Sequence, residues 1–361
     1  MSEVLKSLQL RAGELVEVRS KEEILQTLDA EGQLEGLPFM PEMFAYCGKR
    51  FRVYKRAHKT CDPPNGMKGR RMDRAVHLQD IRCDGAAHGG CQAGCLIFWK
   101  EAWLKRVSAE SQVPGPIPEN SHVSRPVVPA ACDEQNVISK TQKLGSDPTR
   151  IETPTYVCQN TNIAQATHPL PWWDLRQYAE DLSSGNVRFG QMVAAFLFFL
   201  YHNLAAAGLG IGSAMRLFYD LFQKVRGGTP YPWRMGRIPK GTRTPSAKLD
   251  LVPGEIVRTR SYREILETLD EDWRNRGMYF DAESVPFCDQ SHRVLARVEK
   301  IIDEKTGKMI KLKNDAIILE GVACEAKYAK CRRFCPRAIY PYWREIWLRR
   351  ENEEAGPKSN G

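Results

Sequence analysis

The sequence lacks the short motifs that carry familiar catalytic chemistry. It has no glycine-rich phosphate loop, no G-x-G-x-x-G, no G-x-S-x-G and no H-E-x-x-H. Histidine is scarce, with 7 in 361 residues, and the histidines are scattered without a paired motif. The acidic residues Asp174, Glu180 and Asp181 fit one helix face better than an acid–base dyad. We assign no catalytic residue, and the sequence favours a protein that is not an enzyme.

Long apolar runs are almost absent. The first twenty residues hold no apolar core of signal-peptide length, so we expect a cytoplasmic protein. The exception is 192–215, which has no charged residue and is long enough to span a bilayer. Polar His202 and several glycines within it favour a buried helical hairpin. A membrane-associated segment is the alternative, supported by Arg216, Lys224 and Arg226 at its end.

The amino-acid composition indicates a globular protein but does not identify its binding partner. A net charge of +9 permits nucleic acid, a membrane surface or a phosphorylated substrate. The 42% hydrophobic and 27% charged residues are typical of a globular protein, and 361 residues predict two or three domains. In a reducing compartment, 11 cysteines favour metal ligation, redox chemistry or buried thiols over disulfides.

An internal repeat organises the chain. "GELVEVRSKEEILQTLD" at 13–29 and "GEIVRTRSYREILETLD" at 254–270 share 11 of 17 residues, at an offset of 241. The same offset carries "YCGKRFRV" onto "FCDQSHRV", and "FWKEAWLKR" later matches "YWREIWLRR". Because this period is too long for a stacked solenoid, we predict two copies of one module.

Changes in composition divide the chain into five parts. A first cysteine-rich module covers 13–107, and a linker or irregular segment rich in Pro, Ser and Asn covers 108–171. A helical region at 172–226 and a second linker at 227–253 follow. The second cysteine-rich module covers 254–350.

Each copy has the same order of predicted elements. A short strand leads into a helix with a capping box, Ser20 with Glu23 in the first copy. Two strands then pair as a hairpin, at 50–61 and 75–83 in the first copy. Each copy ends in an aromatic helix whose tryptophans we expect in the core: Trp99, Trp103, Trp343 and Trp347. The expected fold class is α+β, with two small barrel-like modules, comparable in architecture to an SH3-like barrel, around a helical middle region.

Four cysteines recur in both copies. They are Cys47, Cys83, Cys91 and Cys95, and then Cys288, Cys324, Cys331 and Cys335. The hairpin places the first two of each set at the same open end, and the other two follow within one loop at i, i+4 spacing. Four converging thiolates suit a structural zinc ion, and they also suit an iron–sulfur cluster. We predict two zinc sites, with iron–sulfur clusters or metal-free buried thiols as the alternatives.

The remaining cysteines and histidines give weaker signals. His88 lies within the first cysteine run, but the second copy has no histidine there, which favours a loop histidine over a ligand. Cys61 has no counterpart and is expected to be a lone thiol. A third site would have to use Cys132, Cys158 and His168, whose long spacing supports it only weakly.

Several motifs resemble a bacterial protein family built from this duplication. They are "LPFMPEMFAYCGKRFRVYKRAHKTCD", "RCDGAAHGGCQAGCLIFWKEAWL" and "CRRFCPRAIYPYWREIWL", and "PLPWWDLRQYAEDL" extends the resemblance to nearly the whole chain. The resemblance implies the duplicated architecture and a bacterial cytoplasmic setting. It implies no activity.

These patterns predict a metal-binding accessory or scaffold protein of bacterial metabolism, with zinc favoured and a protein partner expected. An iron–sulfur or thiol redox protein, or an oxidoreductase component, is the first alternative. A nucleic-acid-binding protein with zinc modules is the second. The basic run "KCRRFCPR" favours it, but the matching "GCQAGCLI" of the first copy carries no charge. Membrane contact through 192–215 is compatible with each function.

Overall fold

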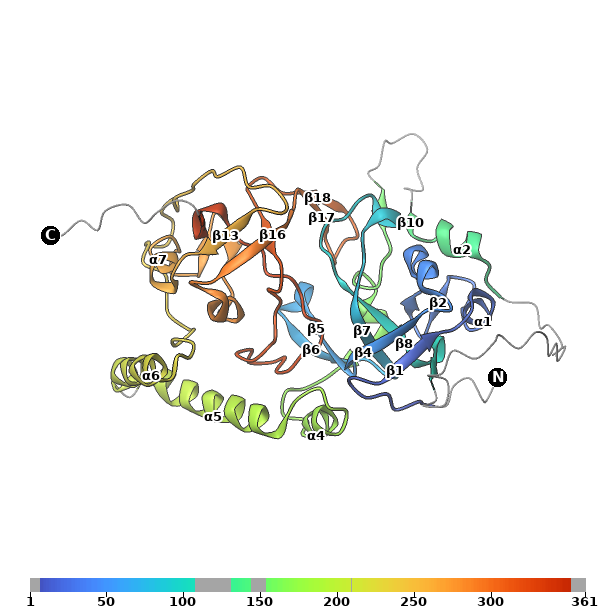
Figure 1. Cartoon of the computed structure of the whole chain (residues 1–361), viewed down its shortest axis with the longest axis horizontal. Coiled ribbons are helices and arrows are strands. Elements are labelled where there is room, and N and C mark those ends of the chain that lie inside the picture. Colours follow the sequence, from blue (N-terminus) through green and yellow to red (C-terminus); the bar gives the residue numbers. More distant parts are fainter. Residues whose placement is uncertain (1–6, 108–130, 144–153, 209, 352–361) are drawn as a thin grey trace. The chain divides into compact units, whose positions relative to one another are not determined.

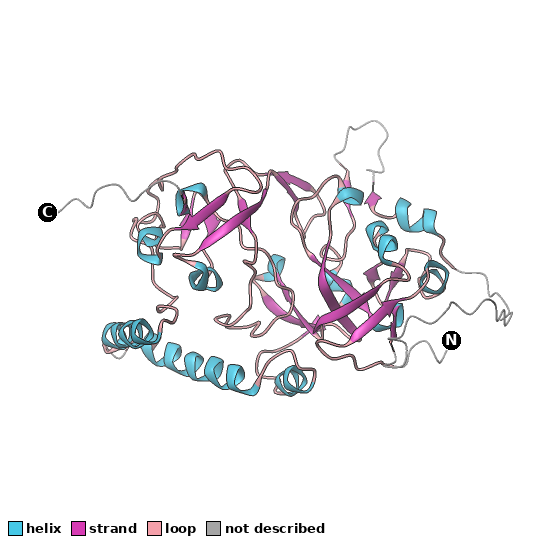
Figure 2. Ribbon diagram, in the orientation of Figure 1, coloured by secondary structure: helices cyan, strands magenta, loops and turns pink. Residues whose placement is uncertain are grey.

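The protein has a mixed α+β fold, as the sequence predicts (Figure 2). The computed structural model describes residues 7–107, 131–143, 154–208 and 210–351. Parts of the predicted linker 108–171 therefore lie outside the described residues. The chain forms two compact units. The first unit contains the chain up to Val187 with Ile302–Met309 and Cys335–Arg337, and the second unit contains the rest.

A curled five-stranded sheet forms the centre of the first unit (Figure 1). In spatial order its antiparallel strands are β8 (Leu96–Lys100), β7 (Ala75–Arg82), β4 (Arg50–Arg56), β1 (Leu15–Val18) and β9 (Leu104–Arg106). Buried and partly exposed residues alternate along β1, as expected for a strand with one face in the core: Val16 and Val18 are fully buried and their neighbours are partly exposed. The predicted capping box is confirmed, with Ser20 and Glu23 closing the start of α1 (Lys21–Leu25).

The predicted aromatic helix of the first copy is wrong. Trp99 lies in β8, and Trp103 ends the 3-10 helix Glu101–Trp103. All five residues of β8 are buried, so the segment has no polar face from which a helical period could be distinguished. Pairing with β7 fixes the strand, as in the match of His77 with Phe98. The expectation that the tryptophans are core residues is confirmed, since none of the four is more than 1% exposed.

The predicted continuous strand 50–61 is also wrong. It breaks after β4, and β5 (Lys59–Asp62) joins β6 (Lys68–Arg71) and β12 (His168–Pro169) in a separate three-stranded sheet. The predicted pairing of the flanking strands survives, because β4 and β7 are antiparallel neighbours.

The sheet of the second unit repeats three of the four strand pairings of the first. Its order is β19 (Ile317–Leu319), β16 (Ser291–Arg297), β13 (Ile256–Thr259) and β20 (Leu348–Arg350). Ile256 pairs with Arg293 as Leu15 pairs with Arg52 in the first unit. The capping box of α7 (Tyr262–Leu266) is confirmed. The second aromatic helix is wrong, because Trp343 bridges to β19 and Trp347 ends the 3-10 helix Glu345–Trp347.

Three helices occupy the predicted helical region: α4 (Arg176–Ser183), α5 (Phe189–Ala206) and α6 (Gly212–Arg226). Among the described residues, α5 is the one helix long and apolar enough to cross a membrane by length and composition. Only 22% of it is buried, so the expected buried hairpin is wrong.

The remaining elements are short. The strands are β2 (Gln33–Leu34), β3 (Leu37–Pro38), β10 (Gln142–Lys143), β11 (Thr155–Tyr156), β14 (Arg274–Asn275), β15 (Met278–Tyr279), β17 (Lys300–Ile302) and β18 (Met309–Lys311). The helices are α2 (Glu134–Ser139) and α3 (Ile163–Ala166), with 3-10 helices at Pro41–Tyr46, Pro63–Asn65, Ala86–His88 and Ala282–Phe287.

Candidate metal centre

The end of the β7–β8 pair brings two cysteines together in the first unit. Cys83 directly follows β7, and Cys95 directly precedes β8. The backbone N–H of Cys83 donates to the carbonyl of Cys95 over 2.8 Å, which continues the strand ladder by one residue. Strand pairing therefore places the two cysteines side by side.

The connecting loop is folded tightly by glycine. Gly85 has a φ of 73°, and a Cβ atom there would lie 1.9 Å from the carbonyl oxygen of Cys91. Any other residue would collide with that backbone as well as adopt an unfavourable conformation. The fold of this loop presents His88 and Cys91 on the same side as the strand ends.

Cys158 reaches the same place from a distant part of the sequence. The next residue, Gln159, accepts from the N–H of Phe98 over 2.8 Å and donates to its carbonyl over 2.9 Å. A side chain thereby takes the place of a neighbouring strand along β8 and holds Cys158 against the loop.

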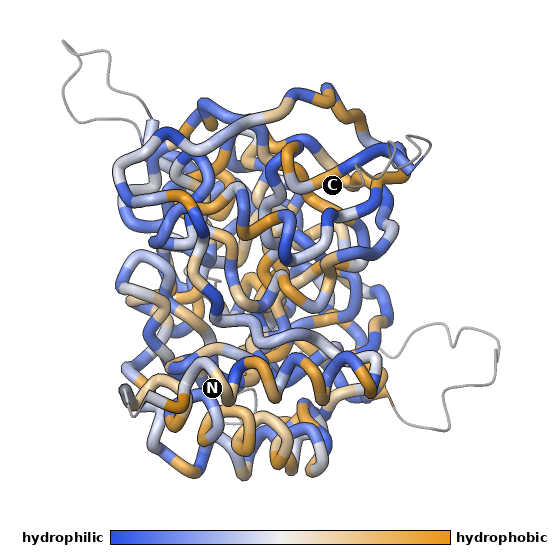
Figure 3. Tube along the Cα trace, turned by 90° about the vertical axis from the view of Figure 1, so that its left-hand side faces the viewer, coloured by the Kyte–Doolittle hydropathy of each residue, from blue (hydrophilic) through white to orange (hydrophobic). Residues whose placement is uncertain are grey.

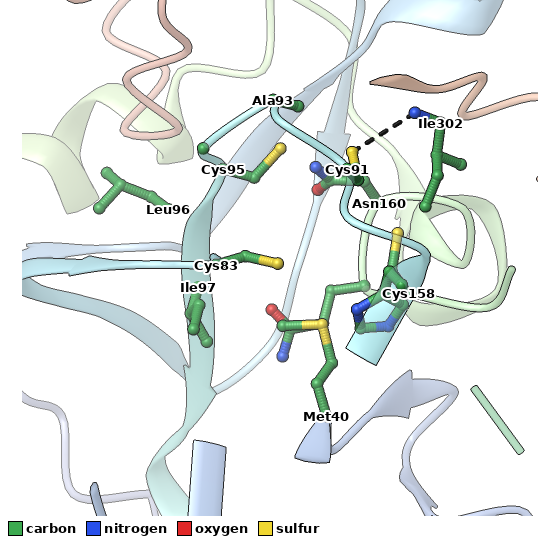
Figure 4. A pocket seen from close by; sticks show the side chains of 13 residues that line it. Met40, Cys83, Cys91, Ala93, Cys95, Leu96, Ile97, Cys158, Asn160 and Ile302 are labelled. Carbon is green, nitrogen blue, oxygen red and sulfur yellow. Dashed lines mark hydrogen bonds between the residues drawn. The ribbon is translucent and has the colours of Figure 1, made fainter. Parts of the chain in front are cut away.

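Four cysteines line one small pocket in this unit (Figure 4). They are Cys83, Cys91, Cys95 and Cys158, and His88 also lines it. The backbone N–H of Ile302 donates to Sγ of Cys91 over 3.4 Å. The cavity volume is about 30 Å³, which is room for an ion with one or two waters.

Three different ligand types meet where Glu42 contacts the pocket residues Cys83 and His88. The ligand atoms of Glu42, Cys83 and His88 all lie within 4.8 Å of one another. Sγ of Cys83 donates to Oε1 of Glu42 over 2.9 Å, and Nδ1 of His88 lies 3.5 Å from the same oxygen. Within the described ranges, no other group of three His, Cys, Asp or Glu side chains is this close.

Two buried polar atoms of this group have no hydrogen-bond partner among the described residues. They are Oε2 of Glu42 and Nδ1 of His88, on side chains that are 8% and 1% exposed. Leaving such an atom unpaired costs about 1–3 kcal/mol. The other ring nitrogen of His88, Nε2, lies 3.2 Å from the carbonyl of Val157. A proton on Nε2 would satisfy that carbonyl and leave the Nδ1 lone pair for a metal, which is how ligand histidines are commonly oriented.

Burial favours the protonated form of three of the pocket thiols, those of Cys83, Cys95 and Cys158. It raises the pKa of Cys83 far above its usual range, and the nearby Glu42 carboxylate raises it further. Burial also raises the pKa of Cys95, to about 12, and that of Cys158. Burial acts to raise the pKa of Glu42 too, but contacts with His88 and Cys83 outweigh it and hold that pKa below its usual range. A bound cation would supply the positive charge that stabilises the thiolates.

The structure brings together three of the four cysteines predicted for the first module. Cys83, Cys91 and Cys95 share the pocket, whereas Cys47 lies outside it. Burial raises the pKa of Cys47, and the ammonium group of Lys21 opposes that shift.

Sequence reasoning missed Glu42 and Cys158 and set His88 aside. A signal for Glu42 was present, because the offset of 241 carries it onto Glu283. Cys158 has no counterpart and no ligand-like spacing, so only the folded chain reveals it. Its suggested companions lie elsewhere: His168 is 77% exposed on its strand, and Cys132 donates to the carbonyl of Asp133.

The cysteines predicted for the second site have different surroundings. Cys288 donates to the carbonyl of Ser284 over 3.9 Å, and Cys331 is exposed. Arg332 donates to Sγ of Cys324 over 3.5 Å and to Asp281 over 3.0 Å. Cys335 belongs to the first unit.

Glu283, the counterpart of Glu42, is engaged by the backbone. It accepts from the N–H groups of Lys327 and Tyr328 over 2.9 and 2.6 Å. Burial, together with the charge of the neighbouring Asp281, raises its pKa to about 7. Glu42 thus faces a thiol and an imidazole in the first unit, whereas its counterpart Glu283 caps a loop in the second unit.

Cys61, expected as a lone thiol, contacts an arginine in its own unit. It is buried in β5, where Nη1 of Arg337 donates to its carbonyl over 3.0 Å and lies 3.8 Å from its sulfur. Arg337 also forms an ion pair with Glu304.

No family model, curated protein or solved structure matches this chain. A metal centre is therefore inferred from the geometry of the pocket alone.

Proposed function

We propose that the first unit is a zinc-binding module and that the protein is an accessory or scaffold protein rather than an enzyme. One observation carries the proposal. Glu42, Cys83 and His88 converge within 4.8 Å, and two of their buried polar atoms have no partner among the described residues. A cation between them would satisfy both atoms at once.

The donor set favours zinc. Sulfur, nitrogen and oxygen donors in one group suit a borderline-soft ion, whereas calcium and magnesium prefer oxygen alone. Zinc takes four ligands, so one more cysteine completes the set. We choose Cys95, because its backbone is bonded to Cys83 and its thiol is close enough for its charge to raise the pKa of the Cys83 thiol.

The size of the site supports a structural role. A cavity of about 30 Å³ is about a tenth of the smallest usual ligand pocket. Zinc bound there would tie the 3-10 helix Pro41–Tyr46 to the loop between β7 and β8. The ion would thereby cross-link two parts of the fold, as expected of a structural site in an accessory or scaffold protein, and the cavity leaves no room for a substrate.

An iron–sulfur or thiol redox centre is the second candidate, and the four cysteines of the pocket favour it. In that case Cys158 would be a ligand. Under the zinc proposal it is a buried neighbour. Replacing Cys158 with serine therefore separates the two candidates.

We also propose that the two units descend from one duplicated module. Equivalent strand pairings, two capping boxes and one shared tryptophan–threonine bond support this proposal. An SH3-like barrel remains the architectural comparison. A second zinc at Cys288, Cys324, Cys331 and Cys335 stays a prediction.

We do not propose nucleic-acid binding. Two arginines of the basic run are engaged within the second unit. Arg332 forms an ion pair with Asp281 at 3.0 Å, and Arg333 lies 4.4 Å from the ring centre of Phe199.

Metal analysis of the full chain purified without oxygen tests the proposal. We expect zinc, no visible colour, and loss of that zinc in Cys83→Ser and His88→Ala. Cys132→Ser is the matched control, because Cys132 is buried but lies outside the pocket. Iron and sulfide, with absorbance at about 400 nm, would overturn the zinc proposal in favour of the redox candidate. Absence of any metal would overturn both.

A further inference from the structure

The second unit presents an apolar surface on two consecutive helices. The side chains on one side of α5 are between 40% and 72% exposed: Phe189, Val193, Leu197, Leu200 and Leu204. Their spacing of three or four residues places them in one stripe along the helix. Orange segments recur along these helices at the lower edge of Figure 3.

Helix α6 carries a second stripe. Its members are between 46% and 82% exposed: Leu217, Phe218, Leu221, Phe222 and Val225. Single exposed apolar residues are ordinary, but ten on two successive helices mark an interaction surface. We call these ten residues the α5–α6 face.

The other side of α5 is packed against protein. Nδ1 of His202 lies 2.7 Å from the hydroxyl of Tyr231. The guanidinium of Arg333 lies over the rings of Phe196 and Phe199, at 5.2 and 4.4 Å from their centres. Because Tyr231 and the guanidinium of Arg333 hold this side of α5 within its own unit, the helix cannot be surrounded by lipid without losing these contacts. The geometry fits a helix that lies in the plane of a membrane surface rather than one that crosses it.

Charge around the α5–α6 face favours an anionic partner. Residues 188–226 contain four basic residues and one acidic residue, a net charge of 4 − 1 = +3. Arg188, Lys224 and Arg226 are exposed at the helix ends. The single carboxylate, Asp220, forms an ion pair with Arg234. If a second copy of the chain bound through the same face, the basic helix ends of the two copies would meet. Residues 188–226 have no other carboxylate that could pair with them. Anionic headgroups supply the missing negative charge.

We propose that the α5–α6 face docks in the plane of an anionic lipid surface, with its apolar side chains at the boundary of headgroups and acyl chains. The basic residues at the helix ends contact the headgroups. This proposal is independent of the zinc site.

Vesicle sedimentation of the full chain tests the proposal. We expect the protein to sediment with phosphatidylcholine vesicles that contain about one-third phosphatidylglycerol, and to stay in solution with phosphatidylcholine alone. Leu197→Glu with Leu221→Glu should weaken that binding about tenfold or more. High salt should weaken it, and alkaline carbonate should release the protein.

Ile310→Glu is the matched control, because Ile310 is an apolar residue of β18 that is 43% exposed and lies outside the face. It should bind like the unaltered protein. No sedimentation with either vesicle would overturn the proposal. Binding that resists carbonate would show insertion instead. A dimer in solution that Leu221→Glu dissociates would assign the face to a second copy of the chain.

Discussion

The thiol of Cys83 donates a 2.9 Å hydrogen bond to the carboxylate of Glu42, and the two residues are 41 positions apart in the sequence. The carboxylate is thereby fixed at the edge of a pocket that holds three more cysteines. We predict that Glu42→Gln weakens zinc binding about 10–100-fold, because the amide keeps the shape but loses the charge. Competition with a chelator measures the affinity. Glu31→Gln, at an exposed carboxylate paired with Lys140, is the control. Equal affinities for Glu42→Gln and the unaltered protein would exclude the carboxylate as a ligand.

Cys47 and Cys95 distinguish the zinc ligands expected from the sequence repeat from those proposed from the structure. Both belong to the four cysteines that recur in the two copies, but only Cys95 lines the pocket. We expect Cys95→Ser to release zinc and Cys47→Ser to retain it. Zinc content per chain after gel filtration is the readout. If Cys47→Ser lost its zinc and Cys95→Ser retained it, the structural choice of Cys95 would be wrong and Cys47 would be a ligand, as the repeat suggests.

Gly85 should be essential to the loop that presents His88 and Cys91. Gly85→Ala places a Cβ atom 1.9 Å from the carbonyl of Cys91. Gly48 has nearly the same φ, 72°, but an added Cβ would have open space around it. We expect Gly48→Ala to cost about 1 kcal/mol and Gly85→Ala about 1–3 kcal/mol more, with loss of zinc. Urea unfolding measures both, and equal costs would mean that the loop moves aside without effect.

The sequence predicted those features that short-range chemistry decides. The capping boxes at Ser20 and Ser261 were readable because cap and partner are three residues apart. The equivalence of strand pairings in the two units follows the offset of the repeat. β8 was misassigned because a strand buried on both sides has no period that distinguishes it from a buried helix.

The site was only partly predictable for a similar reason. Cys83, Cys91 and Cys95 lie on one loop and its flanking strand ends, so local spacing identified them. Cys158 is brought there by the hydrogen bonds of Gln159 to Phe98, a contact across 61 residues that no local pattern encodes. His88 was set aside because the second copy lacks it, but the second copy also has a different loop around Glu283.

Paired tryptophans offer a test of the duplication. Nε1 of Trp103 donates to Oγ1 of Thr27 over 3.0 Å, and Nε1 of Trp347 donates to Oγ1 of Thr268 over 2.9 Å. We expect Trp103→Phe and Trp347→Phe to cost similar free energies of unfolding. Trp99→Phe is the control, because its buried Nε1 has no partner among the described residues. The control should be less destabilising by about 1 kcal/mol, the usual net value of such a bond. Thermal or urea unfolding gives the comparison, and a smaller loss in Trp103→Phe than in Trp99→Phe would contradict it.

His202 should make the second unit less stable in mild acid. Burial, together with the positive charges of Lys330, Arg216 and Arg333, lowers the pKa of this imidazole from 6.5 to about 4. Between these values the unfolded chain binds a proton that the folded chain does not, so stability is full above 6.5 and is lost as the pH falls toward 4. We expect this group to contribute a loss of about 2 kcal/mol between about pH 7 and about pH 4.5, measured by urea unfolding. His202→Gln retains a polar group for Tyr231 but does not titrate, so its stability should fall less over the same interval. Parallel pH profiles for the two proteins would show that another group controls the acid sensitivity.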